Sequence, residues 1–334
     1  MAQKISACYI VKNGAADLEL SLKSLNNFVD EIIVVDTGST DNTVEVAKKF
    51  GAKIFFEQWQ NDFSTPRNVA LKNATGDWIV FLDADEYFSS ETAQNIRFAV
   101  ETAQKFNQQG MLIFLVNIDV DDGNKILGTS YVMRIFKNLR DLKYIGKIHE
   151  ELRIDKKPLS PITFAPPNVL TLYHTGYSKS VNKNKAERNL KMLLAELEET
   201  DEPQRIYGYI AECYNGLDDF TTAEKFARLD IENKGNNSSR SYRIILKILA
   251  STQERLNERM NFAKLAVEKF PNLPEFTAEL AECYAAQKNF SKAVEMMQLA
   301  ITQFQNYKGI EGSTFNIQSA ELAERFIKIW SDKI

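Results

Sequence analysis

The sequence predicts two kinds of domain in one chain. The first is an α/β domain, with a mostly parallel central sheet and helices on both faces. The second is an all-α domain of stacked helical repeats. Up to about residue 120, strand-like and helix-like segments alternate, which is typical of parallel sheets. From about residue 180, the helical pattern continues without a strand signal and repeats at a nearly constant spacing.

The alternation in the first half rests on continuous apolar runs, which predict buried strands, and on apolar residues at helical spacing between them. We expect strands at 5–11, 31–36, 52–57 and 77–83, and helices at 17–29, 40–50 and 64–74. Thr40 or Asp41 is expected to cap the second helix. Thr65 is expected to cap the third, where Pro66 suits the first helical position.

The second half contains an internal repeat. The sequence "AECY" occurs at 211–214 and again at 281–284, and Ile231, Val267 and Ile301 lie 36 and 34 residues apart in similar helical contexts. Steps of about 34 residues are typical of tetratricopeptide-like helix pairs. The expected units are 203–236, 237–272 and 274–308, followed by a helix at 312–330. We therefore expect the α/β domain at 1–180, a linker helix at 181–202 and repeats at 203–334. A helical bundle with chance similarity is the alternative.

Composition and charge disfavour several classes of protein. Apolar residues make up 44% of the 334, charged residues 26%, and the net charge is −4, so the basic field of a nucleic-acid-binding protein is missing. No apolar run approaches the ~18 residues of a membrane span, and the N-terminus lacks a signal-peptide layout. The three cysteines are far apart and odd in number. We expect neither a disulfide framework nor a zinc site, and a cytoplasmic location.

Three acids follow a buried run in "GDWIVFLDADEYF" (76–88): Asp83, Asp85 and Glu86. Asp36 also ends an expected strand, and parallel sheets bind ligands at the carboxyl ends of their strands. In an extended chain, residues i and i+2 point the same way, so Asp83 and Asp85 are able to face one ion. Mg²⁺ or Mn²⁺ takes oxygen ligands and keeps positions for substrate phosphates. A solvated turn is the alternative.

Five ordered segments resemble family 2 glycosyltransferases of GT-A fold: "EIIVVDTGSTDNT" (31–43), "NDFSTPRNVAL" (61–71), "WIVFLDADEYF" (78–88), "IGKIHEEL" (145–152) and "LYHTGY" (172–177). The resemblance is strongest to members that carry a helical repeat domain behind the catalytic domain and act on peptides, flagellin or the cell surface. It implies a GT-A nucleotide-sugar-binding domain, a nucleotide-sugar donor, most often a UDP-sugar, and a Mg or Mn cation.

The resemblance also implies roles for individual residues. The implied donor-binding residues are Asn13, Asp36, Ser39, Arg67, Asn68 and Asp83, with Asp36 at the uracil or ribose. The implied metal ligands are Asp83, Asp85 and His174. One departure concerns residues 11–14, where relatives usually have "YNE" and this chain has "VKNG". Asn13 is kept, the acid is replaced by Gly14, and Asp17 is the candidate substitute.

The two histidines of the chain, His149 and His174, both fall in these motifs. The resemblance implies that Glu150 is the base that deprotonates the acceptor, with Glu151 as second choice. His149 would then position a loop or the acceptor, and His174 would complete the metal site. For each histidine, a purely structural role is the alternative.

The implied reaction is an inverting transfer of the sugar to a hydroxyl or thiol. Because repeat arrays form concave surfaces suited to peptides, a polypeptide acceptor held by the repeats is expected. Three alternatives stay open. The acceptor is a saccharide, since "RIFK" at 134–137 is similar to a segment of saccharide-building relatives. The repeats serve self-association, as in a homodimer. Or the chain is an adaptor with an inactive transferase domain.

Overall fold

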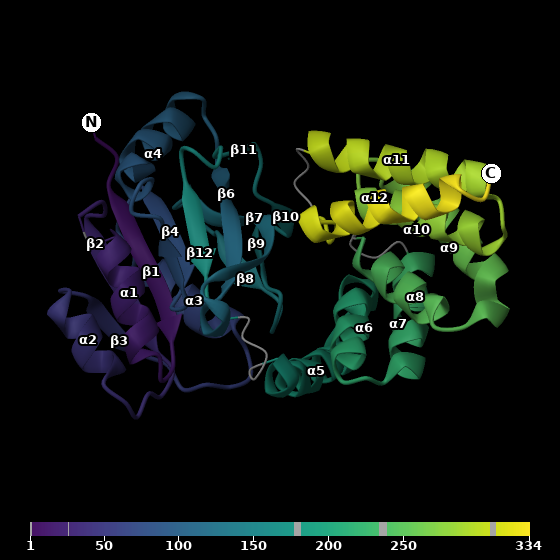
Figure 1. Ribbon diagram of the computed structural model, residues 1–334. Helices are drawn as coiled ribbons and strands as arrows, with labels where there is room; N and C mark the ends of the chain where they lie inside the picture. The colour runs from purple at the N-terminus through teal and green to yellow at the C-terminus, as the bar shows by residue number, and fades with distance from the viewer. Residues whose placement is uncertain (1, 26, 177–181, 234–238, 308–311) are drawn as a thin grey trace. The chain divides into compact units, whose positions relative to one another are not determined.

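The structure is a computed structural model that describes residues 2–25, 27–176, 182–233, 239–307 and 312–334 (Figure 1). The chain divides into two compact units, Met1–Val181 and Asn182–Ile334. Within the described residues, all strands belong to the first unit, and the second contains only helices and their connections.

A mixed sheet forms the centre of the first unit. Its strands lie in the order β3 (Lys53–Phe56), β2 (Glu31–Asp36), β1 (Ile5–Val11), β4 (Trp78–Asp83), β7 (Lys125–Lys137), β6 (Gly110–Asp119), β12 (Thr171–His174) and β5 (Glu86–Phe88), and β11 (Ile162–Phe164) also pairs with β6. The β7 strand is antiparallel to β4 and β6, and β5 is antiparallel to β12. The remaining pairs are parallel, so the prediction of a mostly parallel sheet is confirmed.

Helices cover both faces of this sheet. The helices α1 (Ala15–Leu25), α2 (Thr43–Lys49) and α4 (Ile96–Lys105) pack on one face. The other face carries α3 (Ser64–Asn73) and a small sheet of β8 (Lys143–Ile145), β9 (Glu151–Ile154) and β10 (Lys157–Pro158). Because side chains alternate along a strand, Tyr9 and Cys8 of β1 enter opposite cores. Burial on both faces explains the continuous apolar runs. Short 3₁₀ turns lie at Ala93–Asn95 and Val120–Asp122.

The caps of α2 and α3 differ in part from the expectation. The Thr65 N–H donates to Asp62 Oδ1 at 3.1 Å and its hydroxyl donates to Asp62 Oδ2 at 3.0 Å. Asp62 is therefore the capping acid, and Thr65 is its partner inside α3. The N-cap of α2 is Asn42, neither Thr40 nor Asp41, although Asp41 Oδ1 accepts the Thr43 N–H at 3.0 Å just before it.

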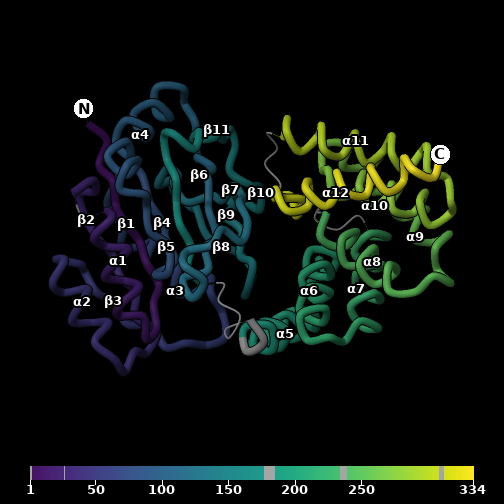
Figure 2. The backbone as a smooth tube through the Cα atoms, in the orientation of Figure 1, coloured from purple at the N-terminus to yellow at the C-terminus, as the bar shows by residue number. Residues whose placement is uncertain are grey.

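The second unit is a succession of helices, each packed on its neighbours along the chain (Figure 2). They are α5 (Asn182–Glu199), α6 (Tyr207–Gly216), α7 (Phe220–Glu232), α8 (Arg240–Ala250), α9 (Leu256–Lys269), α10 (Pro274–Ala286), α11 (Phe290–Asn306) and α12 (Ile317–Ser331), with 3₁₀ turns at Pro203–Arg205 and Gln253–Arg255. Each expected repeat unit contains one helix pair. Ion pairs such as Arg243–Glu275, at 2.6 Å, join helices of successive pairs.

The three cysteines are free and buried: Cys8 in β1, Cys213 in α6 and Cys283 in α10. Burial raises the pKa of all three thiols, that of Cys213 to about 12 and that of Cys283 to about 11. Among the described helices, none is both long enough and apolar enough to cross a bilayer.

Candidate functional site

The candidate site lies at one edge of the central sheet. The strands β2, β4 and β12 all run in the same direction, because β1 is parallel to β2 and β4, and β12 is parallel to β6 across the antiparallel β7. Their last residues are Asp36, Asp83 and His174. The fold therefore places three of the sequence-predicted residues at the edge where open α/β sheets bind ligands.

Asp36 carries an unused acceptor. Its Oδ1 accepts the N–H groups of Gly38 and Ser39, both at 2.9 Å, and Gly38 has the positive φ of 103° that glycine adopts without strain. The Oδ2 of Asp36 is buried and has no hydrogen-bond partner among the described residues. Leaving such an oxygen unpaired costs free energy, so a ligand N–H or O–H would be favoured there.

Asn13 and Ser39 form hydrogen bonds that stabilise the turn after β2. Asn13 Oδ1 accepts the Thr40 N–H at 2.7 Å, and the Asn13 N–H donates to Ser39 Oγ at 2.9 Å. The ends of β1 and β2 are thereby tied together. Burial raises the pKa of Asp17, and the negative charge of Asp85 adds to this effect.

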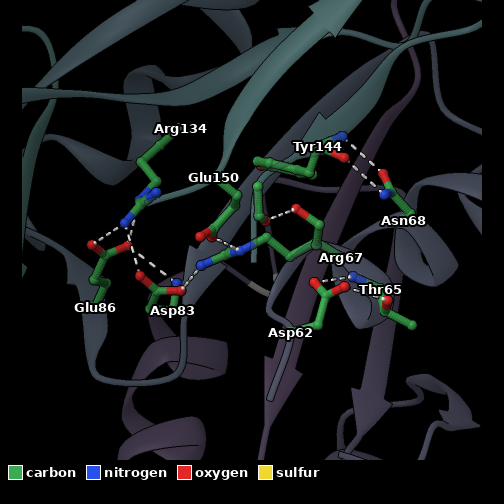
Figure 3. Close-up of polar contacts among 11 residues, drawn as sticks. Asp62, Thr65, Arg67, Asn68, Asp83, Glu86, Arg134, Tyr144 and Glu150 are labelled. Atoms are coloured by element: carbon green, nitrogen blue, oxygen red, sulfur yellow. Dashed lines mark hydrogen bonds and ion pairs between the residues drawn. The ribbon is translucent and has the colours of Figure 1, made fainter. Parts of the chain in front are cut away.

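The two candidate residues of α3 have different surroundings (Figure 3). Arg67 is buried, donates from Nη2 to Asp83 Oδ1 at 2.6 Å and forms an ion pair with Glu150. Asn68 instead uses both ends of its amide on Tyr144 of β8: Nδ2 donates to the carbonyl at 3.0 Å, and Oδ1 accepts the N–H at 2.8 Å. Arg67 is thus part of a cluster with the carboxylates of Asp83, Glu86 and Glu150, which we call the acid cluster. Asn68 instead binds the backbone of β8 beside it.

Both oxygens of Asp83 are used by arginines. Oδ1 bonds Arg67, and Oδ2 accepts from Arg134 Nη2 at 2.8 Å. Burial would raise the pKa of Asp83, but Arg67 and Arg134 outweigh it and hold that pKa well below its usual range. Burial raises the pKa of Glu86, although Arg134 opposes this. The sequence reasoning did not place Arg134 in the site. The only signal was its position in "RIFK".

Asp85 meets His174 beyond this cluster. Asp85 Oδ2 lies 3.3 Å from His174 Nε2, and His174 Nδ1 lies 2.8 Å from Asn117 Oδ1. The Asn117 contact holds the ring from its Nδ1 side, so Nε2 is the nitrogen that faces Asp85. A Cβ on Gly176 would collide with both Asp85 Oδ2 and His174 Nε2, so glycine at this position keeps the space between them open.

This pair fits a divalent cation. Adjacent ligands of an octahedral ion with bonds of about 2.1 Å lie roughly 3.0 Å apart, close to the 3.3 Å between Asp85 and His174. Within the described ranges, no three or more His, Cys, Asp or Glu side chains converge as a metal-binding group, and Asp83 faces the arginines. Mg²⁺ is commonly held by one or two protein carboxylates, with the remaining positions left to phosphates and water, and Asp85 would be such a carboxylate.

The segment 145–152 is attached to the start of α3. The Phe63 N–H donates to the Lys147 carbonyl at 2.8 Å. His149 has a φ of 51°, a left-handed conformation that is uncommon for residues other than glycine. Glu150 points to Arg67, whereas Glu151 pairs with Arg153 at 2.8 Å. Of the two glutamates, Glu150 is therefore the one in the acid cluster.

Comparisons with known proteins show which families and relatives this chain is similar to. Residues 6–149 match the family described as Glycosyl transferase family 2. The chain is 34% identical over 213 residues to a TPR repeat-containing protein of Synechococcus elongatus, an alignment that covers 62% of this chain and 50% of the relative. It is 30% identical over 272 residues to the SPbeta prophage-derived glycosyltransferase SunS of Bacillus subtilis, covering 79% and 61%. The chain thus spans only part of the length of these curated relatives.

Among solved structures, TarS 1–349 of S. aureus in complex with UDP-GlcNAc matches with a TM-score of 0.41 at 16% identity, covering 91% of this chain and 92% of that one. Residues 6–149 thus match the family that the motifs predicted. A helical unit follows it.

Proposed function

We propose that the protein is a metal-assisted, inverting glycosyltransferase that moves a sugar from a UDP-sugar to a hydroxyl or thiol of a polypeptide. The observation that supports this most is the pairing of two features at one sheet edge. Asp36 offers an unpaired buried acceptor, and Asp85 with His174 forms a place for a cation. A uridine diphosphate has N–H and O–H groups that can donate to Asp36, and negatively charged phosphates that can bind a cation held by Asp85 and His174.

On the donor side, Asp36 Oδ2 would accept the N–H of uracil or a ribose hydroxyl. Ser39 and Asn13 would support it by fixing the turn that shapes this pocket. Arg67 lies next to the acids as a buried cation, and guanidinium groups pair well with phosphates. Asn68 would contribute indirectly, through the position of β8.

On the metal side, Asp85 and His174 would hold Mg²⁺ or Mn²⁺. When bound, such an ion offsets charge on the departing diphosphate and orients it. Asp83 would not bind the cation directly, since its two oxygens accept hydrogen bonds from Arg67 and Arg134. It would instead help to position the turn that carries Asp85. The Asn117 contact at Nδ1 would orient the His174 ring so that Nε2 faces the cation.

Glu150 is the proposed base, because it is the glutamate of the pair that lies with the acid cluster. It would take the proton of the acceptor as that group attacks the anomeric carbon. His149, in its left-handed conformation beside Glu150, would position the acceptor loop. Attack on the face opposite the diphosphate inverts the configuration of the sugar.

The acceptor is proposed to be a polypeptide held by the helical unit. The support is the succession of helix pairs at the predicted spacing, an architecture that suits peptide binding in repeat proteins. The cytoplasm is the proposed location.

A panel experiment tests the function. The full chain is incubated with several UDP-sugars and Mn²⁺, first alone and then with lysate proteins or with saccharide acceptors, and products are followed by mass. Donor hydrolysis together with a mass shift on a polypeptide supports the proposal. A shift on saccharides alone would reassign the acceptor. Absence of both hydrolysis and Mn²⁺-dependent UDP binding would favour the inactive adaptor.

A further inference from the structure

Arg134 occupies an irregular position in the sheet. Across β6 and β7, Ile135 lies opposite Met111 and Met133 lies opposite Leu112. Arg134 is therefore the extra residue of a β-bulge and has no partner of its own on β6. Bulges interrupt the regular alternation of side chains and often re-aim a side chain next to a functional site.

The bulge directs Arg134 into the acid cluster (Figure 3). Its Nε and Nη2 each donate to one oxygen of Glu86, both at 2.7 Å, and Nη2 also donates to Asp83 Oδ2 at 2.8 Å. The Glu86 side chain is only 2% exposed and that of Arg134 is 17% exposed. A two-point pair of this kind fixes direction as well as charge.

The two acids that Arg134 binds lie on either side of a very short turn. Asp83 ends β4, Glu86 begins β5, and only Ala84 and Asp85 lie between them. Glu86 Oε2 also accepts the Asp83 N–H at 3.1 Å. Arg134 therefore holds both ends of the turn that carries Asp85. From the other side, the Asp85 carbonyl accepts the Thr175 N–H at 3.1 Å.

The ion pair between Arg134 and Glu86 also balances the buried negative charge of Glu86. Without Arg134, Glu86 would be a buried carboxylate with no cation, next to the carboxylate of Asp83. A buried carboxylate that loses its partner is costly to keep in place, so it moves or takes up a proton, and in both cases the bonds that fixed the turn are lost. The part free to rearrange is the short turn, and Asp85 would move with it, away from the 3.3 Å approach to His174.

We propose that Arg134 is a positioning residue that sets the acid turn so that Asp85 and His174 can share one cation. The inference rests on the proposed metal-assisted donor site. It gives a role to a residue of the "RIFK" segment that the donor chemistry itself does not use. Arg134 acts through Asp85 and makes no contact with the cation.

The test compares UDP affinity with Mn²⁺ and with EDTA, measured by calorimetry on the full chain, together with thermal unfolding. The ratio of the two affinities reports the cation site separately from general damage to the fold. We expect Arg134→Met to reduce this ratio about tenfold or more, the scale for groups that support metal ligands. UDP binding in EDTA should change little.

Two further variants make the result specific. Arg97→Met removes an arginine that also bonds two carboxylate oxygens, those of Asp30 at 3.0 and 3.3 Å, in the same unit. This control should keep the ratio of the wild type. Arg134→Lys keeps the charge but cannot reproduce three bonds in one plane, so it should recover only part of the ratio. Arg134→Lys also serves if Arg134→Met fails to fold.

The outcomes separate the two proposals. If the wild type gains affinity with Mn²⁺ and Arg134→Met, or Arg134→Lys in its place, keeps the full gain, the positioning role is overturned while the donor site stands. If the wild type shows no gain with Mn²⁺, the metal-assisted donor site is overturned, and the positioning role with it. A reduced ratio in both arginine variants but not in Arg97→Met supports the inference.

Discussion

Asp85 and His174 approach to 3.3 Å although 89 residues separate them in the chain. The approach requires β12 to pair with β5. It also requires a glycine at position 176, because a Cβ there would collide with both side chains. Asp85 is partly exposed, and His174, although only 8% exposed, belongs to neither apolar cluster of the sheet. The pair is therefore suited to direct tests by substitution.

Asp85→Ala should abolish transfer, a loss of 10²-fold or more by the usual scale for an essential charged group, while the thermal midpoint stays close to that of the wild type. Transfer assays and thermal unfolding measure the two effects. EDTA added to the unmutated protein should have the same result on transfer. Full turnover in excess EDTA would rule out the cation role of Asp85.

Gly176→Ala should reproduce much of the Asp85→Ala effect by a different route. The added methyl group would enter the space between Asp85 Oδ2 and His174 Nε2, so UDP binding should lose its Mn²⁺ dependence. Calorimetry with UDP, in Mn²⁺ and in EDTA, measures this. A matched change at Gly128, where a Cβ would meet no atom within 4 Å, should leave the Mn²⁺ dependence intact.

Glu150→Gln should lower transfer by roughly 10²-fold or more, the scale for loss of a general base. Glutamine keeps the shape but cannot accept the proton, so UDP affinity should barely change. Glu151→Gln removes an acid that pairs with Arg153 instead, and its effect should be mild. The reverse order of effects in steady-state kinetics would exchange the two roles.

Asp36→Asn should weaken UDP binding with or without the cation. A hydrogen bond to a charged group contributes about 1.5–3 kcal/mol, which corresponds to roughly 10- to 150-fold in Kd. The Asn side chain keeps one acceptor for Gly38 and Ser39 but loses the charge. Unchanged UDP affinity in calorimetry would show that the unpaired oxygen of Asp36 does not face the nucleotide.

The predictable part of the molecule is the part governed by local patterns. The strands at 5–11 and 31–36 were expected with the bounds that the structure shows, because both faces of these strands are buried and the apolar runs are uninterrupted. The strand pattern also placed Asp36 and Asp83 at strand ends, and the family 2 resemblance assigned donor or metal roles to them and to Arg67, Asp85 and His174.

Long-range geometry was not predictable. Nothing in the local sequence shows that Arg134 sits in a bulge or that it turns toward Glu86, since the bulge depends on pairing with β6. Likewise, Asn68 follows Arg67 directly, but the helix turns it toward the backbone of Tyr144. Helical rotation of about 100° per residue separates neighbours in this way.

Stability should fall in acid partly through Glu31. Burial raises its pKa, but hydrogen bonds from Lys53, Ser6 and Thr75 outweigh this and bring the pKa to about 2, from an ordinary 4.5. Because the folded pKa is the lower one, the stabilisation is present above about pH 4.5 and is lost as the pH falls toward 2. It amounts to about 1–3 kcal/mol.

Urea denaturation of the wild type and of Glu31→Gln at pH 7 and at pH 3 measures this contribution. The difference in unfolding free energy between the two proteins should shrink at pH 3. An equal difference at both pH values would mean that Glu31 contributes by packing rather than by charge.

The three buried thiols make it possible to measure the unfolding of each unit separately. Cys8 lies in the central sheet, whereas Cys213 and Cys283 lie in the helical unit. Burial keeps all three in the unreactive protonated form, so an alkylating reagent modifies them only when the surrounding structure opens. Peptide mapping after timed alkylation would therefore show whether the sheet or the helices open first under denaturant, without any introduced label.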